Sequence, residues 1–234
     1  MPELGSRELL ALWEAGSTQD PVRRAVTLLA AARGGPAAEA ATVDVGTRDV
    51  LLAGLFRQVA GDQAPACADC PGCGVVLDVP VDVAAVAALP VHGPGERLSV
   101  LVDGAEVPFR LPTTADLIAL GGRPPDQARA ALLAACLGTE PEAARGAEAE
   151  AAVETAMEQA APGGAIDLQV ACPACGLDSS LPLDVPALLW AEIEAQASAL
   201  MRDVHALAAT YGWTEADVLD LSPRRRAIYL DLAG

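Results

Sequence analysis

The sequence Cys70-Pro71-Gly72-Cys73-Gly74 returns later in the chain as Cys172-Pro173-Ala174-Cys175-Gly176. Both copies read C-P-x-C-G, a tight turn in which two thiols face one point and the last glycine lets the backbone bend. Two such turns supply four thiolates, the usual ligand set of a structural zinc ion. Residues typical of strands border the turns, so the sequence predicts a split zinc ribbon with halves in residues 63–90 and 164–186.

The predicted zinc ligands are the four cysteines of these two turns, Cys70, Cys73, Cys172 and Cys175. A site that has lost its metal, or a pairing of Cys67 with Cys70, is the alternative, and Cys67 could also compete as a ligand. His92 and His205 lack ligand spacing to any cysteine, which argues against a catalytic zinc site. The two turns match each other, which argues against a thioredoxin-like redox role.

The charge of the 234-residue chain narrows the possible partners, because the formal net charge is -17. Phosphate backbones and anionic membranes are bound by clustered cations, so neither nucleic acid nor a membrane surface is an expected partner. No apolar run reaches the length of a bilayer span, and residues 1–12 contain acids instead of an apolar core. We therefore expect a cytoplasmic protein, in which cysteines are more typical of metal ligands than of disulfides. Cys136, in an apolar helical run, is expected to be a small buried residue.

The N-terminal part has the apolar spacing of helices. Residues 6–16 and 48–60 are predicted amphipathic helices, with Thr47 as the N-cap of the second. Asp20-Pro21 is a strong helix start between them. Residues 36–44 are small and polar and are expected to form a loop.

The segment between the two cysteine turns is predicted to contain a hairpin and helices. After the first turn, alternating residues 75–83 favour one strand, which Pro80 restricts to an edge or a bend. Asp103-Gly104 predicts a two-residue hairpin turn between strands 98–102 and 106–111. One helix is expected to begin at residues 112–116, and another is expected over 125–137. The Ala/Glu-rich residues 138–163 are expected to contain a mobile, solvated surface helix. Strands are expected over 166–170 and 181–185.

The C-terminal part gives the strongest helical signal. Apolar residues recur every third or fourth position and predict a long helix whose stripe is Leu189, Ile193, Ala197, Leu200, Val204, Leu207 and Tyr211. We expect this stripe to be buried against helices 21–32 and 48–60. Gly212 ends the helix, and Thr214 and Ser222-Pro223 begin two short ones.

The expected fold class is α+β, mainly α, with helical ends around a split Cys₄ zinc ribbon that carries a β-hairpin and helix insertion. The predicted regions are an N-terminal helical region, the first half of the ribbon, the insertion, the second half of the ribbon, and a C-terminal long helix with two short helices. Their boundaries are 1–62, 63–90, 91–163, 164–186 and 187–234.

A resemblance to a known family rests first on the C-terminal sequence. The residues that carry it are Asp203-Val204-His205-Ala206-Leu207-Ala208, Tyr211-Gly212-Trp213-Thr214-Glu215-Ala216-Asp217-Val218-Leu219, and Ser222-Pro223-Arg224-Arg225-Arg226 with Tyr229-Leu230. They resemble the end of T-even-phage-type baseplate proteins, which are encoded with contractile phage tails and phage-like contractile injection systems.

The resemblance extends upstream, where several motifs are similar to longer, zinc-ribbon-bearing members of that family. These are the paired C-P-x-C-G turns, Leu12-Trp13-Glu14, Pro21-Val22-Arg23-Arg24-Ala25, Gly46-Thr47-Arg48-Asp49, Leu51-Leu52, Phe109-Arg110-Leu111-Pro112-Thr113 and Asp116-Leu117. Residues 138–163 match nothing in the family.

The resemblance implies a non-enzymatic structural or assembly protein of the baseplate or its hub, with other particle proteins as partners. It supplies no catalytic residues, and it places the protein in the cytoplasm or within an assembled tail-like particle. From their types, which are enriched at interface hot spots, the expected exposed partner-binding residues are Trp213, Arg224, Arg225, Arg226 and Tyr229. In an acidic chain the three arginines could instead pair with the protein's own acids. The alternative function is a cytoplasmic zinc-ribbon adaptor or regulator that binds another protein.

Overall fold

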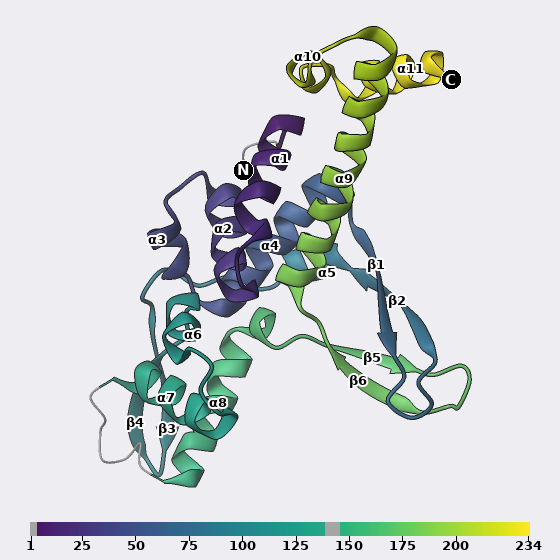
Figure 1. Cartoon of the computed structure of the whole chain (residues 1–234). Coiled ribbons are helices and arrows are strands. Elements are labelled where there is room, and N and C mark those ends of the chain that lie inside the picture. The colour runs from purple at the N-terminus through teal and green to yellow at the C-terminus, as the bar shows by residue number, and fades with distance from the viewer. Residues whose placement is uncertain (1–3, 139–145) are drawn as a thin grey trace.

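Within the part of the chain that the structure describes, the fold is mainly helical with three small antiparallel sheets, which confirms the expected α+β class. The computed structural model describes residues 4–138 and 146–234. Figure 1 shows a central helical body from which two hairpins project together to one side. The insertion between these hairpins lies at the other side, and two short helices sit at the far end of the long helix α9.

Four N-terminal helices form most of the central body: α1 (Ser6–Ser17), α2 (Pro21–Arg33), α3 (Ala37–Ala41) and α4 (Val45–Ala60). Asp20 caps α2 as predicted, since its side chain accepts from the backbone N–H of Val22 and Arg23. Two predictions are wrong here. Residues 36–44 contain α3 instead of being all loop. Helix α4 begins earlier than predicted and is capped by Asp44 instead of Thr47, because Asp44 accepts from the Thr47 backbone N–H at 2.8 Å.

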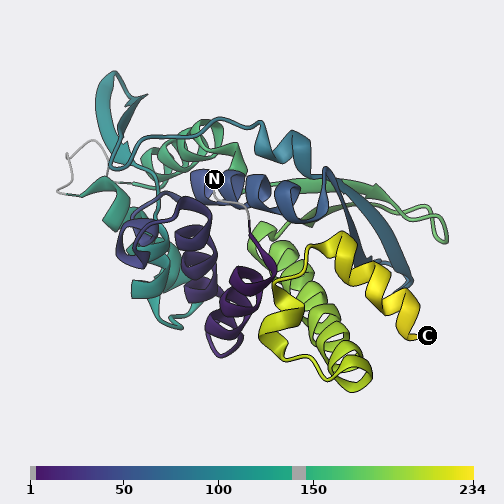
Figure 2. The same cartoon turned by 90° about the horizontal axis from the view of Figure 1, so that it is seen from above.

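The long helix α9 (Val185–Tyr211) completes the central body. The first part of its apolar stripe packs on α2 and α4, as predicted, whereas the later part packs mainly on α1 and α10. The prediction that the whole stripe is buried is wrong for Tyr211, which is exposed. Leu189 and Ile193 join the main core, whereas Leu200 belongs to a second cluster with Leu9 and Leu219. The helix runs beside α1 in both ribbon views (Figures 1 and 2). Its stripe therefore continues past the main core to the C-terminal helices.

The C-terminal helices α10 (Glu215–Leu219) and α11 (Pro223–Ala233) have the predicted starts. Gly212 ends α9 in the left-handed region with φ 69°. Thr214 forms a capping box with Asp217, and Ser222 caps α11. These local signals depend only on neighbouring residues, which is why the sequence predicts them well.

The insertion has its own apolar core. It contains β3 (Arg97–Val102), β4 (Ala105–Arg110), α6 (Thr114–Leu120), α7 (Pro125–Leu137) and α8 (Ala147–Ala160). The hairpin turn and α7 lie where the sequence predicts them. The expectation of a solvated helix within 138–163 is wrong for α8, because Val153 is fully buried and Ala149 nearly so against the β3–β4 hairpin and α7. Residues 139–145 of that segment lie outside the described ranges.

A buried polar network joins the insertion to α4. The Arg48 guanidinium donates to the Asp49 carboxylate at 2.6 Å and to the Thr114 hydroxyl of α6 at 3.2 Å. Burial raises the pKa of Asp49, although the contact with Arg48 opposes this shift. The contact fixes α6 on the first turns of α4.

A second connection runs through the loop before β3. The His92 backbone N–H donates to the Thr47 hydroxyl at 2.8 Å, and the His92 ring lies 2.8 Å from the Ala160 carbonyl and 3.2 Å from Glu96. The Ala160 carbonyl and Glu96 raise the pKa of His92. Thr47, which the sequence suggested as a helix cap, thus holds this loop instead.

Candidate metal centre

Two β-hairpins bring the cysteine turns together. The first pairs β1 (Gln63–Asp69) with β2 (Val76–Asp82), and the second pairs β5 (Asp167–Ala171) with β6 (Asp178–Pro182). Both hairpins project to the same side of the helical body, as both views show (Figures 1 and 2). Each cysteine turn links the two strands of one hairpin, so the turns lie at the hairpin tips.

The strand predictions near these turns need correction. The single strand predicted over 75–83 is shorter, because Asp82 caps the short helix α5 (Val83–Ala87). The buried face of β2 is Leu77, Val79 and Val81, as the alternation predicts. Strand β1, whose Pro65 lies opposite Pro80 in β2, was not predicted from the sequence.

In the second hairpin the strand predicted over 181–185 lies earlier. It is β6, and Val185 instead starts α9, because the Asp184 side chain accepts from the Ala187 backbone N–H.

The two turns have the same backbone geometry. Gly74 N–H donates to the Cys70 carbonyl and Gly176 N–H to the Cys172 carbonyl, both at 2.8 Å. The two glycines share φ 73°, a left-handed conformation that side-chain-bearing residues rarely adopt. The backbone N–H of each first cysteine also donates to a carbonyl two residues past the second cysteine, in both cases at 2.9 Å. Each hairpin therefore offers its two sulfur atoms in an equivalent arrangement.

The sulfur atoms of the four cysteines form one cluster. They all lie within 4.8 Å of one another, and the Cys70–Cys175 and Cys73–Cys172 sulfur pairs are both 3.7 Å apart. Four thiolates placed tetrahedrally at about 2.3 Å from a zinc ion would be about 3.8 Å apart. Bonded disulfide sulfurs are only about 2 Å apart, and all four cysteines are free. The arrangement fits a metal ion and not a disulfide.

The electrostatics of the cluster favour a bound cation. Backbone N–H groups of Cys73 and Gly72 lower the pKa of Cys70 to about 6. The Leu177 backbone N–H acts in the same direction on Cys175, but the neighbouring sulfurs outweigh it and raise the Cys175 pKa to about 12. One thiol thus ionises readily, whereas further negative charge beside it is unfavourable. A divalent cation among the four sulfurs would remove that repulsion.

The site has an apolar base and a close contact between the turns. Cys70 and Cys172 are buried, whereas Cys73 and Cys175 are exposed. A side chain on Gly72 would approach the Leu177 side chain to 2.8 Å, so only glycine fits without a shift. The apolar base below the sulfurs consists of Leu77, Val79, Leu168, Val170 and Leu181.

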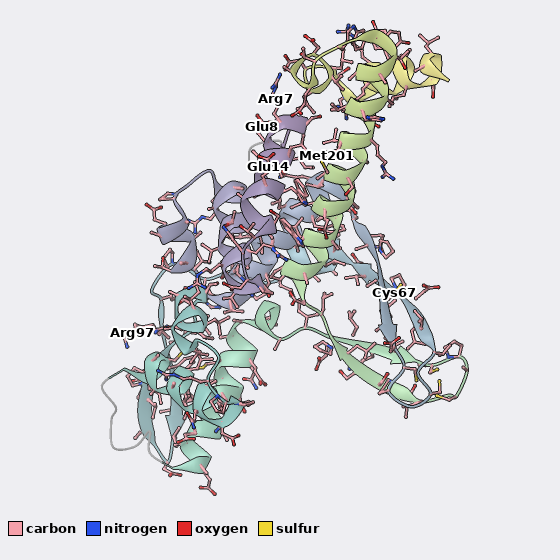
Figure 3. The ribbon with its side chains drawn as sticks, in the orientation of Figure 1. Arg7, Glu8, Glu14, Cys67, Arg97 and Met201 are labelled. Atoms are coloured by element: carbon pink, nitrogen blue, oxygen red, sulfur yellow. The ribbon has the colours of Figure 1, made fainter. Side chains whose placement is uncertain are left out.

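The other candidate ligands are placed elsewhere. Cys67 lies on β1, on the stem of the hairpin (Figure 3), with its sulfur 3.6 Å from an Asp78 carboxylate oxygen. It does not belong to the four-cysteine group. Cys136 is buried in α7, as predicted, and burial raises its pKa to about 11. His205 is exposed on α9, and His92 contacts Ala160 and Glu96.

The expected partner-binding residues at the C-terminus separate into two groups. Trp213 stacks on Tyr211 with ring centroids 4.8 Å apart and meets Tyr229 edge-on at 4.8 Å. Arg224 and Arg225 are exposed.

Arg226 corrects the expectation of an exposed arginine triplet. It is buried, 3.0 Å from Asp203 of α9 and 3.1 Å from the Ser6 hydroxyl. The chain's own carboxylate therefore holds this third arginine.

The exposed Ile228 and Leu232 of α11 were missed, although their spacing of four residues places them on one helical face.

No helix in residues 4–138 and 146–234 is long and apolar enough to cross a membrane. No protein-family model, curated protein or solved structure matches the chain.

Proposed function

We propose that the four-cysteine cluster holds a structural zinc ion. The ligands are four thiols from two turns of the same geometry, and two of them are buried over an apolar base. Four protein ligands fill the coordination sphere of zinc and leave no position for a substrate. The metal would therefore crosslink the β1–β2 and β5–β6 hairpins, which come before and after the insertion in the sequence.

We further propose that the protein is a non-enzymatic structural or assembly protein of the baseplate or hub of a contractile injection system or phage tail. The observation that carries this proposal is the C-terminal sequence resemblance to T-even-phage-type baseplate proteins. The structure supports treating this C-terminal sequence as one motif, because residues from separate parts of it contact one another. Asp203 pairs with Arg226, and Tyr211, Trp213 and Tyr229 form one aromatic cluster.

Deletion of the gene in the strain that encodes the protein tests this role. We expect sheath preparations examined by electron microscopy to lack complete, baseplate-bearing particles, and a plasmid copy of the gene to restore them. Normal numbers of full-length particles in the deletion strain would contradict the proposal and favour the zinc-ribbon adaptor. Mass spectrometry of purified wild-type particles then separates a resident component from a transient assembly factor.

A further inference from the structure

The outer face of α11 combines exposed apolar and basic side chains. Ile228 is 51% exposed and Leu232 is 72% exposed. With 3.6 residues per turn, these two residues fall within about 100° of Arg224 and Arg225 around the helix axis. The opposite side of α11 contains Arg226, which is buried against α9 and Ser6. We call Arg224, Arg225, Ile228 and Leu232 the α11 outer face.

The two exposed arginines differ from several others in the chain. Arg7 pairs with Asp220, and Arg226 pairs with Asp203. Within the described part of the chain, no carboxylate forms an ion pair with Arg224 or Arg225. Asp231 is also exposed and lies about 20° from Arg224 around the helix axis, so two arginines and one carboxylate flank the apolar pair in a chain whose net charge is -17.

The helix that carries this face is held in a fixed orientation. Ser222 caps its first turn, and the Arg226–Asp203 ion pair ties it to α9. Tyr229 packs edge-on against Trp213, which stacks on Tyr211 at the end of α9. Tyr229 of α11 thus packs against Trp213 at the end of α9, and α11 lies at the end of α9 farthest from the insertion (Figure 1).

We propose that the α11 outer face docks an acidic amphipathic helix of another protein. The partner helix would place apolar residues on Ile228 and Leu232 and carboxylates beside Arg224 and Arg225. The charge distribution favours this occupant. An acidic partner is repelled by most of this acidic chain and attracted at this face, which fixes where it binds.

A second copy of this chain fits the face less well. A two-fold antiparallel contact through α11 would pair Arg225 of each copy with Asp231 of the other, but it would leave Arg224 facing Leu232 and would bring together two chains that each have a net charge of -17. Nucleic acid would meet the strongly negative remainder of the chain. The acidic helix is thus the occupant that the charges favour.

Photo-crosslinking in the full-length protein tests this docking. A photoreactive amino acid replaces Leu232 in the encoding strain, and the matched control replaces Leu101, which is 73% exposed beside the β3–β4 turn. We expect residue 232, and not residue 101, to crosslink to one other protein at a segment rich in Asp and Glu. Adding Arg224→Glu and Arg225→Glu should reduce that crosslink about tenfold or more and change the thermal midpoint by no more than about 2 °C, because both side chains are exposed.

Several results would overturn the inference. These are no crosslink from residue 232, a crosslink to a second copy or to nuclease-sensitive material, an equal crosslink from residue 101, or a crosslink that survives the charge reversal. The inference deepens the proposed assembly role, because it gives the partner's chemistry, but the two fail separately. Normal particles in the deletion strain contradict the assembly role whatever residue 232 contacts. Absent particles combined with no crosslink from residue 232 contradict only the docking surface.

Discussion

The residues with the clearest chemistry are the four cysteines at the hairpin tips. Each sulfur is positioned by a turn whose hydrogen bonds lie within six successive residues, so each half of the site is local. Joining the halves brings like charges together, and a bound cation would convert that unfavourable contact into a crosslink. Apparent binding energies of structural zinc are on the order of 10 kcal/mol or more, comparable to the stability of a whole domain.

Replacing Cys73 by serine should remove the metal, because the remaining three thiols do not complete a tetrahedral site. We expect the zinc content of purified Cys73→Ser protein to fall well below that of wild type and its thermal midpoint to drop by more than about 5 °C. Cys67→Ser is the matched control and should keep both, because Cys67 lies outside the cluster. Equal zinc contents in the two variants would contradict this assignment.

Asp116 stabilises the insertion through Arg110. The Arg110 guanidinium donates two hydrogen bonds to its carboxylate, at 2.6 and 2.8 Å. Burial opposes ionisation, but hydrogen bonds from Arg110 and Thr113 outweigh it and lower the pKa of Asp116 to about 2. The unfolded chain has a pKa of about 3.9 at this residue. The stabilisation is therefore complete above about pH 5 and is lost progressively as the pH falls through about 4 towards about 2.

Asp116→Asn should lower the free energy of unfolding at pH 7 by about 1–2 kcal/mol. The difference from wild type should shrink as the pH falls through 4 towards 2, because the wild-type carboxyl is then protonated as well. Asp220→Asn is the matched control, since Asp220 forms an exposed pair with Arg7 at 2.8 Å. That change should cost at most about 0.5 kcal/mol. Denaturant titrations across pH check this, and equal effects of the two changes would contradict it.

Site prediction from sequence succeeds where chemistry is local and fails where it depends on packing. The C-P-x-C-G spacing is enough to predict that the four cysteines come together, and this is confirmed. The fate of Arg226 was not predictable, because its partners Asp203 and Ser6 come from distant parts of the chain. Its neighbours Arg224 and Arg225 have the same side chain but are exposed, because the orientation of α11 turns Arg226 towards α9 and the other two towards solvent.

At the scale of elements, helix ends were predicted better than strands. The capping residues Asp20, Thr214 and Ser222 determine three helix starts through their own backbone neighbours. Strand β1 was missed because Pro65 and small residues give it little strand character, and pairing with β2 forms it. Helix α5 was missed because Val83 continues the alternation of β2 and hides the capping role of Asp82.

Helix α8 shows how composition alone misleads. Its alanines and glutamates are typical of a solvated helix, and only Val153 and Met157 are large apolar residues. The β3–β4 hairpin and α7 provide the surface that buries Val153 completely. A narrow stripe of small residues is sufficient for packing when the facing surface is apolar.

Val153→Ala should therefore lower the free energy of unfolding by about 2 kcal/mol, the cost of removing two buried methyl groups and leaving a cavity. Gln159→Ala is the matched control, because Gln159 is exposed on the same helix and should change stability by no more than about 0.5 kcal/mol. Chemical denaturation of both variants measures the difference. A Val153→Ala protein as stable as the control would restore the view of α8 as a solvated helix.

At the scale of the molecule, the metal site is separated from the main core. The two hairpins reach away from the body (Figure 1), and their tips pack on a small apolar cluster that the main core contacts through Leu168. The main core depends instead on α2, α4 and α9. A metal at the tips would therefore stabilise the hairpins directly and the central body through the strands that join them.

Metal removal should loosen the molecule unevenly. We expect chelator-treated protein to exchange backbone hydrogens faster in β1, β2, β5 and β6, while α4 and the first half of α9 keep most of their protection. Hydrogen exchange followed by mass spectrometry checks this against untreated protein. Unchanged exchange in the four strands would contradict a structural role for the metal.

The most direct measurement is metal analysis of the purified full-length protein, combined with X-ray absorption at the zinc edge. We predict one zinc ion per chain, surrounded by four sulfur atoms at about 2.3 Å. Cysteine-substituted protein should show that signal lost for Cys70, Cys73, Cys172 or Cys175 and kept for Cys67. Metal-free protein, a coordination shell containing nitrogen or oxygen, or a disulfide between the two turns would contradict the four-thiolate zinc site.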